Sequence, residues 1–308
     1  MNNAVEVKNL VVQFGEFKAV DNITFDVPRG EIFGFLGANG AGKTTTIRVL
    51  CGLLIPTQGE VSVAGICGND PQHIDALKSK VGYMSQKFTL YDDMTVEENL
   101  EFIASLRKID KGIFEKRKQE LFDFVSFHRS IDTAVKDLPG GMKQQMSLVG
   151  SLLHDPEIIF LDEPTAGVTS AVRAKFWSLI KDLAKRNKTV FVTSHYMDEV
   201  EQCDRIALMR TGELIALDSP SDLKKKTFPD PLYELTAKQE IPFQKVEAIK
   251  ATHLFESFEP HGLHYHVLPK NPESWQRFLQ AEGDLFTYRQ IPATLEDVFI
   301  RLVEGKPS

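Results

Sequence analysis

A short run near the N-terminus has the spacing of a loop that binds phosphate groups. It reads Gly37-Ala38-Asn39-Gly40-Ala41-Gly42-Lys43-Thr44, a full match to GxxxxGK(S/T). Glycines let the backbone curl so that successive N–H groups face the phosphates, and a helix beginning near Gly42 adds the positive end of its dipole. Lys43 is expected to neutralise the β- and γ-phosphates of a nucleotide, and the Thr44 hydroxyl to bind Mg2+. The predicted nucleotide contacts in this loop are Gly37, Asn39, Gly40, Ala41, Gly42, Lys43, Thr44 and Thr45.

The residues around the loop supply the strand and the helix that the motif requires. The apolar run Ile32 to Leu36 predicts a buried strand directly before the loop, and a helical pattern follows it. A glycine-rich turn that matches by chance is the alternative, and this context argues against it. ATP with Mg2+ is therefore the expected ligand.

Two carboxylates follow another apolar run, Ile158 to Leu161, and so stand where α/β sheets bind ligands. Asp162 is suited to hold Mg2+ or its water, and Glu163 to polarise the water that attacks the γ-phosphate. His195 ends the next apolar strand, Val190 to Thr193, and is expected at the same sheet edge with a γ-phosphate contact. The alternatives are a solvated acidic pair and a structural histidine.

The elements that must position these residues predict an α/β fold of the P-loop NTPase type. Through residue 218 short β-rich runs alternate with longer helical ones, which is typical of a mostly parallel sheet covered by helices. Thr95 is a plausible N-cap for one helix, and a second helix is expected from about Gly112 to Phe127. Two helices in succession indicate an inserted helical subdomain, at about residues 87–140.

The C-terminal part is expected to form a separate small α+β domain. Arg205 to Leu217 predicts a hairpin that turns at Thr211-Gly212, and the first, nucleotide-binding domain is assigned to residues 1–222. Residues 223–231, with three lysines and two prolines, are interpreted as a linker. Residues 232–308 then show the order βαββαβ plus a final helix, which predicts a ferredoxin-like regulatory or dimer-contact domain.

Composition excludes several classes of protein. With 42% hydrophobic and 26% charged residues, the 308-residue chain is typical of globular proteins, and no apolar run approaches the roughly 20 residues of a spanning helix. A formal net charge of −7 argues against a nucleic-acid partner. The N-terminus lacks the pattern of a secretory signal, so a cytoplasmic protein is expected. The cysteines Cys51, Cys67 and Cys203 form no CxxC pair and are interpreted as buried apolar residues.

These residues, together with Leu138-Pro139-Gly140-Gly141-Met142-Lys143-Gln144-Gln145, resemble the ATP-binding cassette (ABC) family over residues 4 to 218. In that family the nucleotide lies between two cassettes, and the phosphate loop of one faces the LSGGQ-like signature of the other. The resemblance implies a dimer, with a second cassette that is an identical copy or a related chain. It also implies phosphate contacts from Gly140 and Gly141.

The resemblance assigns two further residues. Phe14 resembles the aromatic residue that stacks on adenine, the alternative being that Phe14 is a core residue while Phe17 or nothing stacks. Gln86, just before the expected inserted helices, resembles the glutamine that senses Mg2+ and the attacking water. The same resemblance implies a partner, an integral membrane permease on a separate chain, which would hold this protein at the inner face of the cell membrane.

Two positions depart from the family pattern. Pro139 stands where serine is usual, and Thr169 where aspartate is usual. Proline supplies neither the serine hydroxyl nor a backbone N–H, but it is tolerated at a helix start, so Gly140 and Gly141 can still face the phosphate. We expect slower hydrolysis rather than none.

The closing segment Pro292 to Ile300 resembles the ending of multidrug-type exporter cassettes and favours export over import. A soluble cassette acting in translation or DNA repair is one alternative, but those proteins usually carry two cassettes or a long coiled coil. A regulatory subunit with slow or no turnover is the other, and Pro139 and Thr169 are its only support. His261, His264 and His266 are interpreted as a polar strand face rather than a metal site, and Lys224 to Lys226 as solvated rather than lipid-binding.

Overall fold

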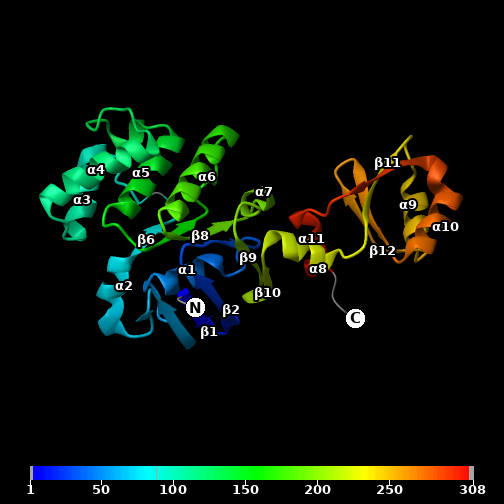
Figure 1. Ribbon diagram of the computed structural model, residues 1–308, viewed down its shortest axis with the longest axis horizontal. Coiled ribbons are helices and arrows are strands. Elements are labelled where there is room, and N and C mark those ends of the chain that lie inside the picture. The colour runs from blue at the N-terminus through cyan, green and yellow to red at the C-terminus, as the bar shows by residue number, and fades with distance from the viewer. Residues whose placement is uncertain (1–2, 88, 305–308) are drawn as a thin grey trace. The chain divides into compact units, whose positions relative to one another are not determined.

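The computed structural model describes residues 3–87 and 89–304. Contacts divide the chain into two compact units, Met1–Ser219 and Pro220–Ser308 (Figure 1). No helix within the described ranges combines the length and the hydrophobicity that crossing a membrane requires.

The first unit is built around a sheet with the strand order β10-β9-β3-β8-β7-β6. Its neighbours from β9 to β6 run parallel, and β10 closes the hairpin with β9. The bounds are β3 Ile32–Leu36, β6 Val81–Met84, β7 Ile158–Asp162, β8 Thr189–Ser194, β9 Arg205–Arg210 and β10 Glu213–Asp218. Every residue of β3, β7 and β8 is buried, which confirms the strands predicted from apolar runs.

Aromatic packing holds the central strands in register. The ring of Phe191 on β8 lies 5.1 Å from Phe33 and 5.3 Å from Phe35, both on β3. The ring of Phe160 on β7 also lies 5.3 Å from Phe191. Because parallel strands that pack in this way end at one edge, the residues after β3, β7 and β8 are brought together there. The helices that connect this sheet are α1 Lys43–Leu50, α2 Ile74–Lys80, α6 Ser170–Lys185 and α7 Met197–Val200.

The first unit also contains a second sheet, which is antiparallel. The prediction of one mostly parallel sheet did not include it. Its order is β2-β1-β4-β5, with bounds β1 Asn3–Phe14, β2 Phe17–Pro28, β4 Gln58–Val63 and β5 Ile66–Cys67. Register shifts interrupt the pairing of β1 with both neighbours, so β1 lacks the simple alternation that reveals a strand in a sequence. Cys67 on the edge strand β5 is exposed, so its interpretation as buried is wrong, whereas Cys51 and Cys203 are buried.

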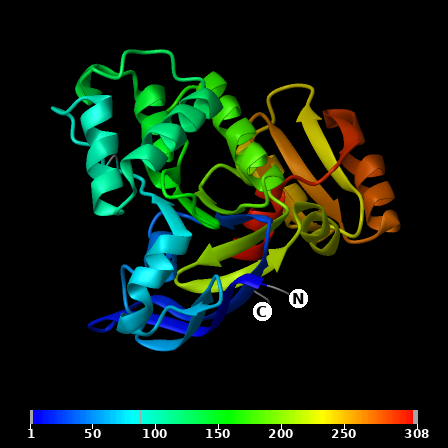
Figure 2. The same cartoon turned by 60° about the vertical axis from the view of Figure 1, so that its left-hand side comes forward.

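Three helices lie beside one another on the side of the first unit opposite to β1 and β2 (Figures 1 and 2). They are α3 Val96–Leu106, α4 Lys111–Val125 and α5 Gly140–Leu152. Thr95 caps α3 as predicted: its hydroxyl accepts from the backbone of Glu98, whose side chain accepts from the Thr95 N–H. The second predicted helix is α4, shifted by one or two residues.

The second unit contains the strands β11 Leu232–Ala237, β12 Phe255–His261, β13 His264–Pro269 and β14 Phe286–Ile291. They form one sheet of order β12-β13-β11-β14 in which all neighbours are antiparallel. The helices are α8 Pro220–Thr227, α9 Phe243–Lys250, α10 Pro272–Glu282 and α11 Leu295–Glu304. The predicted element order from residue 232 onward is confirmed.

The predicted linker at residues 223–231 is wrong in its first half, because α8 continues to Thr227. Proline at the start of the helix and Asp222 in its first turn favour this beginning. The lysines Lys224 to Lys226 fall in the last turn, where positive charge complements the helix dipole. Leu223 is buried, and α8 contacts α11 within the second unit.

The three C-terminal histidines have different surroundings. His264 Nδ1 lies 2.9 Å from the Thr236 hydroxyl, whereas the buried His266 places Nδ1 2.6 Å from Asp297 Oδ1. Ligand atoms of His261, His266 and Asp297 lie within 4.8 Å of one another. The rings of His261 and His266 are stacked nearly parallel, 4.1 Å apart, so their in-plane lone pairs do not converge on one point.

Candidate nucleotide-binding site

The predicted phosphate loop connects β3 to α1. Gly42 is the N-cap of α1 and has a φ of 106°, in the left-handed region that favours glycine. A Cβ at Gly42 would collide with the carbonyl oxygen of Ala19, and one at Gly37 with that of Met209. The backbone of neighbouring elements therefore approaches this loop so closely that only glycine fits at both positions.

Lys43 is buried and points back into the loop. Its Nζ donates to the carbonyl oxygens of Gly37 at 2.7 Å and Ala38 at 3.2 Å, and it lies 3.7 Å from Glu163 Oε1. Burial lowers the pKa of Lys43 from its ordinary value, while the charges of Glu163 and Asp162 act in the opposite direction. A bound phosphate would add negative charge beside the ammonium and favour its charged form.

Asp162 ends β7 and accepts two hydrogen bonds through a single oxygen. Asp162 Oδ1 accepts from the Thr193 hydroxyl at 2.7 Å and the Thr44 hydroxyl at 3.2 Å. Asp162 Oδ2 is buried and has no hydrogen-bond partner among the described residues. A buried, unpartnered carboxylate oxygen beside a hydroxyl is a ligand set that hard divalent cations prefer, so these residues fit Mg2+.

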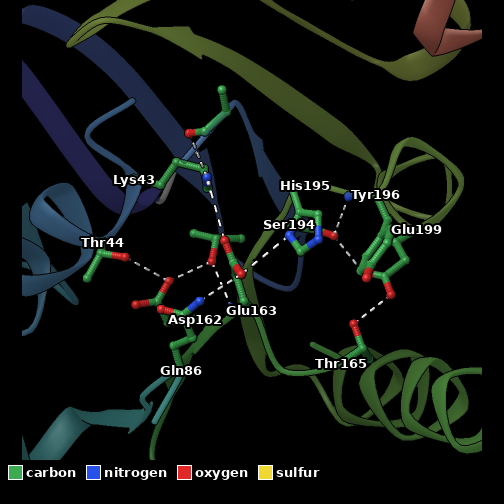
Figure 3. Close-up of polar contacts among 12 residues, drawn as sticks. Lys43, Thr44, Gln86, Asp162, Glu163, Thr165, Ser194, His195, Tyr196 and Glu199 are labelled. Carbon is green, nitrogen blue, oxygen red and sulfur yellow. Dashed lines mark hydrogen bonds and ion pairs between the residues drawn. The ribbon is translucent and has the colours of Figure 1, made fainter. Parts of the chain in front are cut away.

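Glu163 lies at the centre of the cluster (Figure 3). Gln86 Nε2 donates to its Oε2 at 2.9 Å, and His195 Nδ1 lies 3.3 Å from the same oxygen. The backbone of Glu163 is left-handed, with a φ of 49°, and its N–H donates to the Thr193 hydroxyl at 2.9 Å. The structure thus brings Lys43, Gln86 and His195, from three separate segments, around one carboxylate.

A pocket of 460 Å3 opens beside this cluster. Its lining consists of Phe14, Phe17, Ala19, Asn39, Gly40, Ala41, Gly42, Lys43, Thr44, Thr45, Gln86 and Glu163. Phe14 is 52% exposed and Phe17 64% exposed, so the alternative that Phe14 is a core residue is wrong. Both rings stand next to the phosphate loop, where either could stack on a base.

The two positions that depart from the family pattern are both helix N-caps. Pro139 caps α5 through its carbonyl oxygen, which accepts from the N–H groups of Met142 at 2.8 Å and Lys143 at 3.1 Å. Gly140 and Gly141 are the first residues of α5: Gly140 is exposed, Gly141 is half-buried, and neither is among the residues that line the pocket. Thr169 is the N-cap of α6, and its side chain makes no capping hydrogen bond.

Thr193 is a residue that the sequence reasoning missed. Its hydroxyl donates to Asp162 and accepts from the Glu163 N–H, so one side chain fixes both carboxylate residues. The available signal was its place: a hydroxyl at the end of the strand that precedes His195, next to β7 in a parallel sheet.

Comparisons with known proteins show to which family the chain is similar. A model of the ABC transporter family matches residues 20–166. The chain is 42% identical over 239 residues to the probable multidrug ABC transporter ATP-binding protein YbhF of Escherichia coli (strain K12), covering 75% of this chain but 40% of that relative's length. It is 32% identical over 305 residues to the Nod factor export ATP-binding protein I of Ralstonia nicotianae, covering 97% of this chain and 93% of that one. A dimeric post-hydrolysis structure of the ATP-binding cassette MJ0796 with ADP and Pi has a TM-score of 0.64 and 27% identity, covering 70% of this chain and 98% of that one.

Proposed function

The chain belongs to the family of ABC transporter ATP-binding proteins, and from this premise we propose that it binds ATP with Mg2+ and hydrolyses it to power a separate membrane permease. The observation that carries the proposal is the convergence on Glu163 of Lys43, Gln86 and His195, within 3.7 Å, beside the phosphate loop. A glycine-rich turn alone would need none of these partners.

Nucleotide binding is assigned to the loop and the pocket. The backbone N–H groups from Gly40 to Thr44 and the α1 dipole face the phosphates, and Lys43 exchanges its carbonyl contacts for phosphate oxygens. Thr44, Asp162 and Gln86 would hold Mg2+, which supplies positive charge to the phosphate oxygens. Phe14 is assigned to adenine stacking.

Turnover is assigned to Glu163. Its carboxylate accepts hydrogen bonds, so it can orient a water and draw its proton as that water attacks the γ-phosphate. Gln86 and His195 both contact Glu163 Oε2, and they hold the carboxylate in one orientation. His195 is further assigned a contact to the γ-phosphate, because it leaves β8 at the edge where β7 delivers Asp162.

We extend the proposal to the parts of the chain outside this site. The helices α3 and α4, which lie within the predicted residues 87–140, are assigned as the inserted helical subdomain that meets the permease, with Gln86 at its start. The second unit is assigned a ferredoxin-like fold, supported by its strand order β12-β13-β11-β14. Dimerisation through Gly140 and Gly141 is supported by the exposure of Gly140 and the partial exposure of Gly141 at the start of α5. Export, at the inner face of the cell membrane, is supported by relatives named for multidrug transport, Nod factor export and linearmycin resistance.

One observation favours a second candidate, a subunit that occupies ATP with little turnover. Pro139 caps α5 through its carbonyl alone, with no hydroxyl at the position that would face a phosphate. The retained Lys43, Glu163 and His195 favour a working ATPase instead.

The decisive test compares phosphate release by the native chain and Glu163→Gln. Removing the carboxylate should lower turnover by roughly a hundredfold or more, while equilibrium binding of ATP is unchanged. Glu157→Gln is the matched control, because Glu157 precedes β7 at the opposite end and pairs with Lys80 and Arg29 on the surface. Equal turnover in all three proteins would refute hydrolysis at this site.

A tagged pull-down from detergent-solubilised membranes tests the partner: recovery of no polytopic membrane protein would contradict the transport proposal.

A further inference from the structure

A buried carboxylate lies behind His195, on the side away from the phosphate loop (Figure 3). It belongs to Glu199 of α7, a residue that is 1% exposed. Two hydroxyls donate to it: Thr165 Oγ1 to Oε1 at 2.5 Å, and Ser194 Oγ to Oε2 at 2.6 Å. Burying a carboxylate is unfavourable unless each of its oxygens has a hydrogen-bond partner, so this arrangement is specific rather than incidental.

A cation completes the surroundings of Glu199. Arg173 Nε lies 3.3 Å from Glu199 Oε1, and the Arg173 guanidinium lies 4.1 Å from the centre of the Tyr196 ring. The Tyr196 ring in turn lies 4.0 Å from the ring of His195. Glu199 is therefore linked to His195 by a series of side-chain contacts, through Arg173 and Tyr196.

Glu199 is also linked to His195 through the backbone, in a closed circuit of contacts that includes Glu163. Thr165 follows Glu163 by two residues, and Ser194 directly precedes His195. The Ser194 hydroxyl also accepts from the Tyr196 N–H at 3.0 Å, so it fixes the chain on both sides of His195. From His195 the circuit returns to Glu163 by the 3.3 Å contact. The residue that holds the two ends of this circuit together is Glu199.

We propose that Glu199 is a positioning residue that sets the place of His195 against Glu163, and that it acts on turnover only through His195. The inference rests on the proposed function, since its kinetic consequence is a change in ATP turnover. A carboxylate suits the role because it accepts from both hydroxyls at once and neutralises Arg173. An amide would offer N–H donors to a hydroxyl that must itself donate.

The first experiment measures kcat and the KM for MgATP of the full-length protein. Glu199→Gln should lower kcat about tenfold, the loss expected for one hydrogen bond to a charged group, with KM changed less than twofold. Asp198→Asn is the matched control: Asp198 is its neighbour on α7, is 76% exposed and lies 3.9 Å from Arg173, and its variant should keep the native kcat. A loss confined to KM, or an equal loss in Asp198→Asn, would overturn the inference.

A second pair of variants tests the Thr165 hydroxyl while the charge of Glu199 stays in place. This pair also tests the proposal if Glu199→Gln fails to fold. Thr165→Val keeps the shape but removes the donor and should lower kcat about tenfold. Thr165→Ser retains the donor and should restore the native value. Equal kcat in the two variants would contradict the role of the hydrogen bond.

The route through His195 is tested by a double-mutant cycle. In a His195→Ala background, Glu199→Gln should change the remaining turnover less than twofold, whereas a merely structural role predicts the full loss again.

Imidazole NMR signals give a readout that does not depend on turnover. The His195 resonance, identified by its loss in His195→Ala, should shift in Glu199→Gln and stay in place in Asp198→Asn. An inactive native chain with a shifted His195 resonance would refute the ATPase proposal but retain the positioning role. An active chain with an unshifted resonance would refute the positioning role alone.

Discussion

Replacing Pro139 by serine should raise ATP turnover. Pro139 is the N-cap of α5, with a φ of −56° and a ψ of 148°, and its side chain makes no capping hydrogen bond. Serine adopts this conformation readily and is among the preferred N-cap residues. Its hydroxyl has one donor and two acceptor sites, so it can accept from its own helix and still donate to a phosphate of the facing cassette.

The size of the gain follows from one hydrogen bond. A hydrogen bond to a charged group contributes about 1.5 to 3 kcal/mol, which corresponds to roughly a tenfold to hundredfold rise in kcat if it forms in the transition state. Folding should change little, because a serine cap contributes about 1 kcal/mol while the loss of proline's constraint on the unfolded chain removes about 0.4 to 1 kcal/mol. An increase in turnover therefore would not come from stability.

The assay is phosphate release at saturating MgATP, with Pro139→Ala as the control. Alanine removes the ring without supplying a hydroxyl, so its turnover should stay at the native level. An unchanged or lower rate in Pro139→Ser would refute the reasoning. An equal rise in both variants would show that the proline ring, not the missing hydroxyl, limits the reaction.

Three further outcomes are expected. Thr44→Val should raise the Mg2+ concentration for half-maximal turnover about tenfold, because it removes the hydroxyl proposed as a metal ligand, while Thr44→Ser should behave as native in a Mg2+ titration. Gly42→Ala should lower the free energy of unfolding by about 3 kcal/mol, because it adds a collision with Ala19 to left-handed strain, whereas Gly40→Ala, with φ 81° and open space, should lose about 1 kcal/mol in denaturant titrations. Burial lowers the pKa of His154 to about 4, so between pH 4 and 6.5 His154 is protonated in the unfolded chain but not in the folded one. The free energy of unfolding should therefore rise by up to about 3 kcal/mol from pH 4 to 6.5. Denaturant titrations of His154→Gln across that range should lack this rise; an identical pH dependence would contradict the assignment.

The site was predictable where chemistry and strand pattern coincide in a few consecutive residues. The phosphate loop, Glu163 and His195 each directly follow a strand whose residues are all buried, and Asp162 is the last residue of one. Such strands are visible as apolar runs. The family resemblance is confirmed by the comparisons. The roles assigned to the individual residues remain predictions.

What the sequence did not reveal depends on neighbours that are distant along the chain. The antiparallel sheet was missed because bulges in β1 break its alternation. Thr193 offered only its place near the end of a strand as a signal, and Glu199 offered none. A hydroxyl in a strand and a glutamate in a short helix are common, and their roles become visible only through burial and partners. Residues 223–227, the second part of α8, were taken for a linker because three lysines are followed by two prolines, whereas Leu223 is buried and α8 contacts α11 within the second unit.

The helices that open and close the second unit lie against each other. α8 contacts α11, and Arg301 of α11 lies over the ring of Phe228, 5.2 Å from its centre, just past the end of α8. The first and last helices of the unit are therefore packed together, which favours circular permutation. Joining α11 to α8 by a short Gly/Ser bridge and reopening the chain at Gly262, in the turn between β12 and β13, should give a rearranged unit that still folds. Such a unit could be moved between cassettes as a single graft.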